Sequence, residues 1–136
     1  MEITESFMKM EQEVMMKLLA GDDDRLRILR NQYIRVLRKK REFSGTGFFT
    51  SFEIPEDVKK IEIPKVQLGD VVAKVGGVKD GVGFVLFIKN GTIDFLEGYV
   101  YGDEKWPQEV KEYKLTYLSG RERDMEKLRL KWNQGK

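Results

Sequence analysis

Carboxylates and aromatic rings alternate in the segment from Leu96 to Pro107, and these are the residue types best suited to chemistry in the chain. The segment contains Glu97, Tyr99, Tyr101, Asp103, Glu104 and Trp106. Neighbouring carboxylates can work as acid and base or bind a cation, and aromatic rings beside acids can form a pocket for a basic peptide. A structured loop with solvated acids, in which Trp106 fills the edge of the core, is the simpler alternative. Because carboxylates without a positioned partner are a weak signal of catalysis, binding is the functional interpretation we favour.

The composition removes several kinds of chemistry. The 136 residues include no Cys and no His. Disulfides, thiol nucleophiles and Cys-based zinc sites are therefore excluded, and the commonest general base near neutral pH is missing. Any metal site would need oxygen ligands. Any catalysis would use carboxylates, Lys, Tyr or Ser, and the candidate carboxylates are Glu42, Glu97 and Asp103. We expect a protein that is not an enzyme and that has no cofactor and no metal site.

A strongly basic segment runs from Arg25 to Arg41, with eight bases and no acid. It ends in the four consecutive bases Arg38, Lys39, Lys40 and Arg41. Such a cluster can neutralise phosphates of a nucleic acid, and the nearby rings of Phe48 and Phe49 could stack on bases. It is also typical of a solvated helix face followed by a charge-protected edge strand. Residues 1–24 carry a net charge of −5 (seven acids, two bases) and can fold back on the cluster, so we expect no nucleic-acid binding.

The elements that must position these residues can be read from hydrophobic periodicity. Apolar residues at helical spacing predict helices over residues 4–20 and about 23–34. Strands are predicted over about 35–43, around Phe48 to Ile54, and over 66–75, 83–89, 92–100 and 113–118. Asn90-Gly91 is a strong hairpin signal, and Ser44 to Gly47 indicates a second hairpin turn rather than a phosphate loop. This order predicts an α+β fold in which two N-terminal helices pack on an antiparallel sheet of about five or six strands.

One domain over residues 1–119 is expected, followed by a charged segment, 120–136, that is either a tail or a short helix docked by Trp132. The Met-rich first helix has an apolar face wide enough for a core and for a partner, so we expect a homodimer. The chain lacks an apolar run of 18 residues and its first twenty residues do not resemble a secretory signal. We therefore expect a cytoplasmic protein without membrane contact.

Two phrases of the sequence carry a family resemblance. Arg41 to Thr50, REFSGTGFFT, and Leu96 to Pro107, LEGYVYGDEKWP, resemble paired motifs of a family of short bacterial proteins of unknown function. The resemblance covers roughly residues 18–118. Proteins of this size and type are similar to immunity-like proteins that neutralise bacterial toxins, which is a likeness at the level of the fold.

These observations lead to three functional hypotheses. The first is a non-catalytic protein-interaction module, immunity-like or a small assembly factor, whose partner is unknown. Its candidate binding residues are Glu42, Phe48, Phe49, Glu97, Tyr99, Tyr101, Asp103, Glu104 and Trp106. The second is a nucleic-acid-binding protein that uses the basic segment Arg25 to Arg41. The third is a small ligand-binding protein or enzyme that uses the carboxylates near Glu97 and Asp103.

Overall fold

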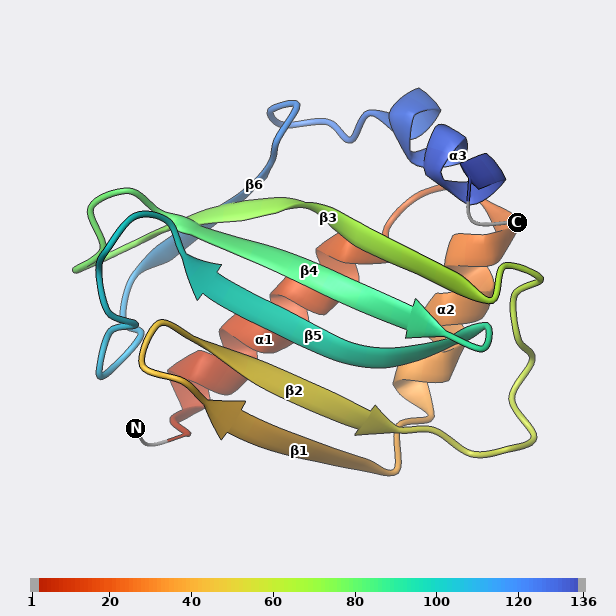
Figure 1. The fold of residues 1–136 in the computed structure, drawn as a ribbon, viewed down its shortest axis with the longest axis horizontal. Helices are drawn as coiled ribbons and strands as arrows, with labels where there is room; N and C mark the ends of the chain where they lie inside the picture. The colour runs from red at the N-terminus through yellow and green to blue at the C-terminus, as the bar shows by residue number, and fades with distance from the viewer. Residues whose placement is uncertain (1–2, 135–136) are drawn as a thin grey trace.

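A computed structural model describes residues 3–134, which form a six-stranded antiparallel sheet with helices on one face and at one edge (Figure 1). The elements in chain order are α1 (Glu5–Leu18), α2 (Asp24–Ile34), β1 (Arg38–Phe43), β2 (Gly47–Glu53), β3 (Lys65–Val75), β4 (Val82–Lys89), β5 (Thr92–Val100), β6 (Tyr113–Tyr117) and α3 (Met125–Gln134). The predicted α+β class with an antiparallel sheet is confirmed.

The strand order in the sheet is β1-β2-β5-β4-β3-β6. Strands β5 and β4 are therefore central, and β1 and β6 are the two edges. The hairpin between β4 and β5 turns at Asn90 and Gly91, whose φ angles are 54° and 75°. Positive φ at both positions is the geometry of a type I′ turn, as the sequence predicts.

The prediction that the helices are N-terminal is incomplete, because α3 lies at the C-terminal end. Of the two alternatives for residues 120–136, the structure has the short helix over Met125–Gln134, and residues 135–136 lie outside the described part. Trp132 anchors this helix in the core, because its ring is fully buried. The guanidinium carbon of Arg25 lies 5.8 Å from the centroid of this ring. The Asp124 side chain caps the first turn by accepting from the amide of Lys127.

Helix α1 buries the apolar stripe that its spacing predicts. Its first turn is capped by Thr4, whose hydroxyl accepts from the amide of Phe7. The buried apolar residues of the stripe are Phe7, Met10, Val14, Met15 and Leu18. The core therefore uses Met10 and Met15, whereas Met8 and Met16 are 41% and 45% exposed. The homodimer stays a prediction, and the exposed methionines Met8 and Met16 are the apolar residues of α1 that could contact a second copy.

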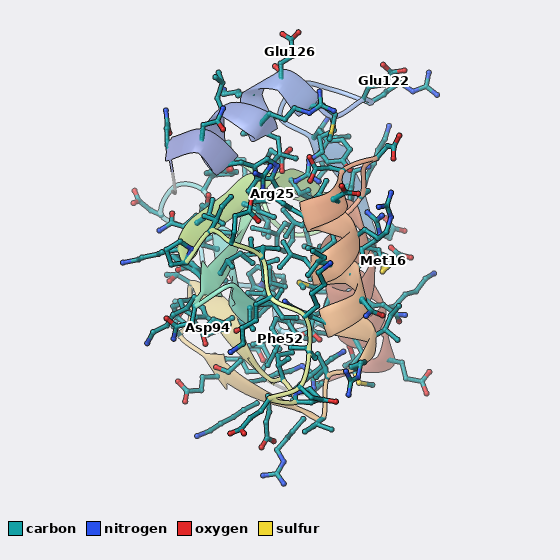
Figure 2. The ribbon with its side chains drawn as sticks, turned by 90° about the vertical axis from the view of Figure 1, so that its right-hand side faces the viewer. Met16, Arg25, Phe52, Asp94, Glu122 and Glu126 are labelled. Atoms are coloured by element: carbon teal, nitrogen blue, oxygen red, sulfur yellow. The ribbon has the colours of Figure 1, made fainter. Side chains whose placement is uncertain are left out.

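The sheet has a covered face and an open face. Helices α1 and α2 pack on one face, and Phe52 points from β2 toward them (Figure 2). The opposite face is the one seen in Figure 1, and no described helix or strand crosses it. Because side chains alternate along a strand, every second residue of each strand lies on this outer face.

Candidate functional site

The two motif segments, which are far apart in the sequence, lie side by side along β2 and β5. Their register pairs Phe48 with Gly98 and Phe49 with Glu97. The turn before β2 extends this pairing: the amide of Val100, at the end of β5, donates to the Thr46 carbonyl at 3.0 Å, and the amide of Trp106 donates to the Gly45 carbonyl at 2.7 Å. The motifs therefore form one structural unit that joins the first hairpin to the loop after β5.

Two of the candidate binding residues belong to the core and not to the surface. Phe48 is fully buried and Trp106 is 4% exposed, and their ring centroids lie 5.2 Å apart in an edge-to-face contact. Phe48 lies on the covered side of β2 because the strand alternates. The predictions that Phe48 stacks on a base and that either ring faces a partner are therefore wrong.

Four other candidates lie on the strands of the outer face, where they join apolar residues that the sequence analysis did not single out. The four are Glu42, Phe49, Glu97 and Tyr99, and the additional residues are Val72, Val85, Phe87 and Phe95. The Phe95 ring lies 5.9 Å from Phe49 and 4.3 Å from Phe87, with which it is stacked at 15°. We call Phe49, Phe87 and Phe95 the aromatic row. It crosses the centre of the outer face over β2, β5 and β4.

Glu97 lies at the centre of this apolar surface. Phe49 is its neighbour on β2 and Val85 its neighbour on β4, and Glu42 follows beyond Phe49 on β1. Glu97 is half-buried, and this burial raises the pKa of its carboxyl. Within residues 3–134, neither Glu42 nor Glu97 forms an ion pair or accepts a hydrogen bond.

Tyr99 and Tyr101 form a pair next to Glu97. Their ring centroids lie 5.4 Å apart, and a Cβ at Gly83 would come within 2.6 Å of both hydroxyl oxygens. Glycine at this position therefore makes room for the pair. Burial and a hydrogen bond with Tyr101 raise the pKa of Tyr99 to about 12, so Tyr99 is a neutral phenol at physiological pH.

The two acids after β5, Asp103 and Glu104, lie apart from Glu97. Glu104 accepts from the backbone amide of Lys79 at 2.6 Å and that of Asp80 at 3.4 Å, so it holds the turn before β4. Asp103 is exposed in the turn after β5, whereas Glu97 is in the middle of that strand. The structure thus does not bring Glu97 and Asp103 together as a catalytic pair would require.

The four consecutive bases of β1 do not form one patch. Arg38 and Lys40 lie on the outer face, and Lys39 and Arg41 lie on the covered face. There the fully buried Glu11 accepts two hydrogen bonds from Arg41, at 2.7 and 2.9 Å, and one from Thr50 at 2.6 Å. The hydrogen bond to Glu11 is the main reason that the pKa of Arg41 is raised. An acid of the N-terminal segment therefore neutralises part of the basic cluster.

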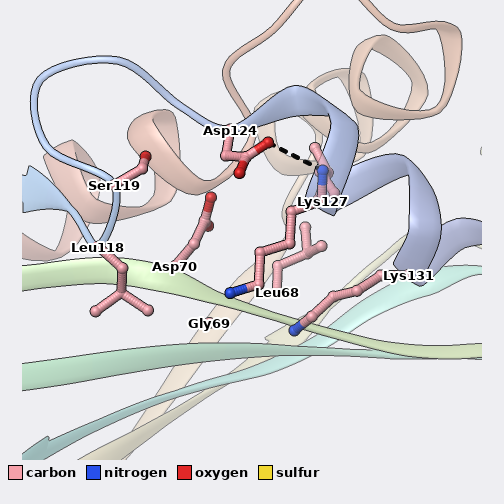
Figure 3. Close-up of a pocket in the computed structure, with 9 residues that line it drawn as sticks. Leu68, Gly69, Asp70, Leu118, Ser119, Asp124, Lys127 and Lys131 are labelled. Carbon is pink, nitrogen blue, oxygen red and sulfur yellow. Dashed lines mark hydrogen bonds between the residues drawn. The ribbon is translucent and has the colours of Figure 1, made fainter.

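A pocket of about 260 Å³ lies between α3 and the bulge of β3 and contains none of the predicted site residues (Figure 3). It is lined by Leu68, Gly69, Asp70, Leu118, Ser119, Asp124, Lys127, Leu128 and Lys131. Its charged groups are largely engaged: Asp70 pairs with Arg123 at 2.8 Å, and the Lys131 ammonium donates to the Gln67 carbonyl at 3.1 Å. Sequence periodicity offered no signal for it, because it depends on how α3 docks.

Among residues 3–134, no group of three or more Asp or Glu side chains is placed to hold a metal ion, and no helix is long and apolar enough to cross a membrane. Comparison with known proteins found no matching family model, no matching curated sequence and no matching solved structure. The family resemblance therefore stays a prediction that depends on the two motifs.

Proposed function

We propose that this protein is a non-catalytic interaction module that binds a protein partner on the outer face of its sheet. The observation that carries the proposal is the aromatic row, which crosses an open sheet face at its centre. Contiguous apolar surface rimmed by polar residues is typical of an interaction site, and buried aromatic side chains supply much of the binding energy at such sites. The immunity-like character of the module is part of this proposal and depends on its likeness in size and fold type to such proteins.

The chemistry of the same face favours binding over catalysis. Glu42 and Glu97 on this face are separated by Phe49, and Tyr99 beside Glu97 is a neutral phenol, because burial and a hydrogen bond raise the pKa of Tyr99 to about 12. A general base near neutral pH would need a pKa close to that pH and a positioned partner. The candidate residues fit binding better than catalysis: Phe49 can serve as an apolar anchor, and Glu42 and Glu97 can accept a cation.

The test compares partner capture by two matched double variants. Phe87→Ala with Phe95→Ala removes most of the aromatic row, and Lys114→Ala with Thr116→Ala changes β6 at the edge of the same sheet. We expect a protein captured from a nuclease-treated bacterial lysate to be lost with the first variant and kept with the second. The captured protein is then purified and its affinity for each variant is measured. Equal affinity for both variants, or no capture by the wild type, contradicts the proposal.

One observation favours a second candidate function on the same surface. Lys40 and Arg38 lie on the outer side of β1, and the register continues from Lys40 through Ser51 to Phe95. Bases beside stacked aromatic rings are the arrangement with which proteins bind single-stranded nucleic acids. Capture that depends on the aromatic row and disappears after nuclease treatment would favour this alternative.

A further inference from the structure

The carboxylate of Glu97 lacks a compensating charge within the described residues. The groups that face it are apolar or neutral: Phe49 and Val85 across the strands, and Phe95 and Tyr99 along β5. The nearest further charge in its row is Glu42, which has the same sign.

The cations close in sequence are not paired with Glu97. Arg41 points to the covered face and binds Glu11, and Arg38 lies 3.6 Å from Glu53. Lys40 is on the outer side of β1, two residues from Glu42, and forms no ion pair within residues 3–134. The row Glu42–Phe49–Glu97 is therefore an aromatic ring with an unneutralised acid on each side.

Burial of a charged group in apolar surroundings is unfavourable unless an opposite charge accompanies it. In the free protein, partial burial destabilises the charged form of Glu97, and the raised pKa of its carboxyl is the consequence. A bound cation would remove the cost and gain a charge-assisted hydrogen bond. The row is thus complementary in charge to a cationic ligand.

We propose that the partner of the outer face presents an arginine side chain, whose guanidinium stacks on Phe49 and pairs with Glu42 and Glu97. This inference depends on the proposed function, because it names the chemistry of that partner. The other two rings of the aromatic row, Phe87 and Phe95, then receive apolar side chains from the same partner segment.

The geometry favours a guanidinium over an ammonium group. Glu42 and Glu97 are on strands two positions apart, so their backbones are separated by about 10 Å across the sheet. A guanidinium is planar, stacks on an aromatic face and directs five donors outward, so one group can serve carboxylates on opposite sides. The compact, strongly hydrated lysine ammonium can do neither of these as well. The two acids also repel a phosphate backbone, which makes a nucleic acid the less suitable occupant of this row.

The experiment is an NMR titration of the full chain, labelled with ¹⁵N, with a single blocked amino acid as the probe. N-acetyl-arginine methylamide is compared with N-acetyl-citrulline methylamide, which has nearly the same shape without the charge, and with the lysine analogue. We expect the arginine probe to bind with a dissociation constant in the millimolar range and to shift the amides of Glu42, Phe49 and Glu97. The citrulline probe should cause no such shifts, and the lysine probe should bind several-fold more weakly.

The variants Glu42→Gln and Glu97→Gln should each weaken the arginine probe about tenfold, because each removes one partner of the pair. Glu126→Gln on α3 carries the same charge change on a distant helix and should leave the affinity unchanged. Neither outer-face substitution removes an interaction within the fold, so folded variants are expected.

Equal shifts with arginine and citrulline, or unchanged affinity in Glu97→Gln, would overturn the arginine inference. If partner capture still depends on Phe87 and Phe95, the proposed function survives that result. If a single-stranded oligonucleotide shifts the same amides and the arginine probe does not, both the inference and the protein-partner proposal fall.

Discussion

At the scale of single residues, Glu11 and Glu97 show how neighbours decide what a glutamate does. Glu11 is completely buried, but Arg41 and Thr50 satisfy its oxygens. Glu97 is only half-buried, yet it lacks such partners within the described residues. The first carboxylate holds the fold together, and the second is available for a ligand.

This contrast predicts that Glu97→Gln stabilises the free protein at neutral pH. The folded state raises the pKa of Glu97 above the 4.5 of an unperturbed glutamate, so the folded state binds the proton more tightly than the unfolded state does. Stability is therefore lost as pH rises from 4.5 through the folded pKa, and the neutral amide avoids this loss. We expect a gain of roughly 0.5 kcal/mol at pH 7, a typical size for a surface position.

The measurement is urea unfolding of wild type and Glu97→Gln at pH 7 and at pH 3.5. The difference should vanish at the lower pH, where the carboxyl is protonated in both states. Glu126→Gln serves as the control for the change in net charge. A variant that is less stable than wild type at pH 7 would contradict the prediction.

The opposite outcome is expected for Glu11→Ala. This variant leaves Arg41, whose side chain is only 13% exposed, without its partner. Removing one member of a buried ion pair costs about 3–5 kcal/mol, because the remaining charge stays uncompensated. Chemical unfolding should show this loss, whereas Gln12→Ala, at an exposed position of the same helix, should change stability by less than about 0.5 kcal/mol. A loss below about 1 kcal/mol in Glu11→Ala would show that water compensates Arg41.

Phe48 and Phe49 illustrate what the sequence could not decide about the site. Strand alternation requires the two rings to lie on opposite faces, but it does not say which face the helices cover. The tertiary structure decides which face is covered: Phe48 packs in the core beneath the helices, and Phe49 lies on the open face. Phe87 belongs to a continuous apolar run, which is typical of a strand buried on both faces and therefore does not indicate an accessible ring, whereas one face of β4 is open.

At the scale of elements, the pairing of β2 with β5 depends on glycine at Gly98. A Cβ at this position would lie 2.2 Å from Cε1 of Phe48, whose ring is fully buried. Gly98→Ala should therefore destabilise the protein by about 1–3 kcal/mol through overpacking. Gly69→Ala is the matched control in β3, because its Cβ would meet Val85 at an ordinary 3.4 Å. Thermal unfolding of both variants checks the prediction, and an equal effect would mean that Phe48 can move aside.

Helix α3 is an element whose existence the sequence left open. The charged composition of residues 120–136 is compatible with a tail, and the decisive feature is Trp132, whose side chain is fully buried in the hydrophobic core. We predict that Trp132→Ala detaches the helix and exposes the segment around residues 119–124 to proteolysis. Limited digestion should cut this variant at least several-fold faster than Leu130→Ala, which changes a residue that is 61% exposed on the same helix. Equal rates would indicate that the helix is held by other contacts.

At the scale of the whole molecule, charge is segregated along the sequence but partly balanced in space. The N-terminal segment and the basic segment have opposite net charges, and Glu11 joins them through Arg41. The sequence predicted the two N-terminal helices, most strand positions and the tight hairpin, because these depend on local periodicity and turn chemistry. The strand order and the open face depend on contacts between distant segments, which periodicity does not encode.

This balance predicts weak or absent binding of single-stranded nucleic acids. Of the four consecutive bases, Lys39 and Arg41 face Glu11, so only Arg38 and Lys40 could contact phosphates on the outer face. Two contacts give a salt slope of about −1.4 on a single strand, too little for tight binding at physiological ionic strength. In fluorescence anisotropy with a short labelled RNA or DNA, we expect no dissociation constant in the micromolar range at 0.15 M salt. A micromolar, salt-sensitive affinity that is lost both in Arg38→Ser with Lys40→Ser and in Phe95→Ala would refute this expectation. That result would make the aromatic row a base-stacking platform, and Glu42→Gln with Glu97→Gln should then strengthen binding by removing the repulsion of the phosphates.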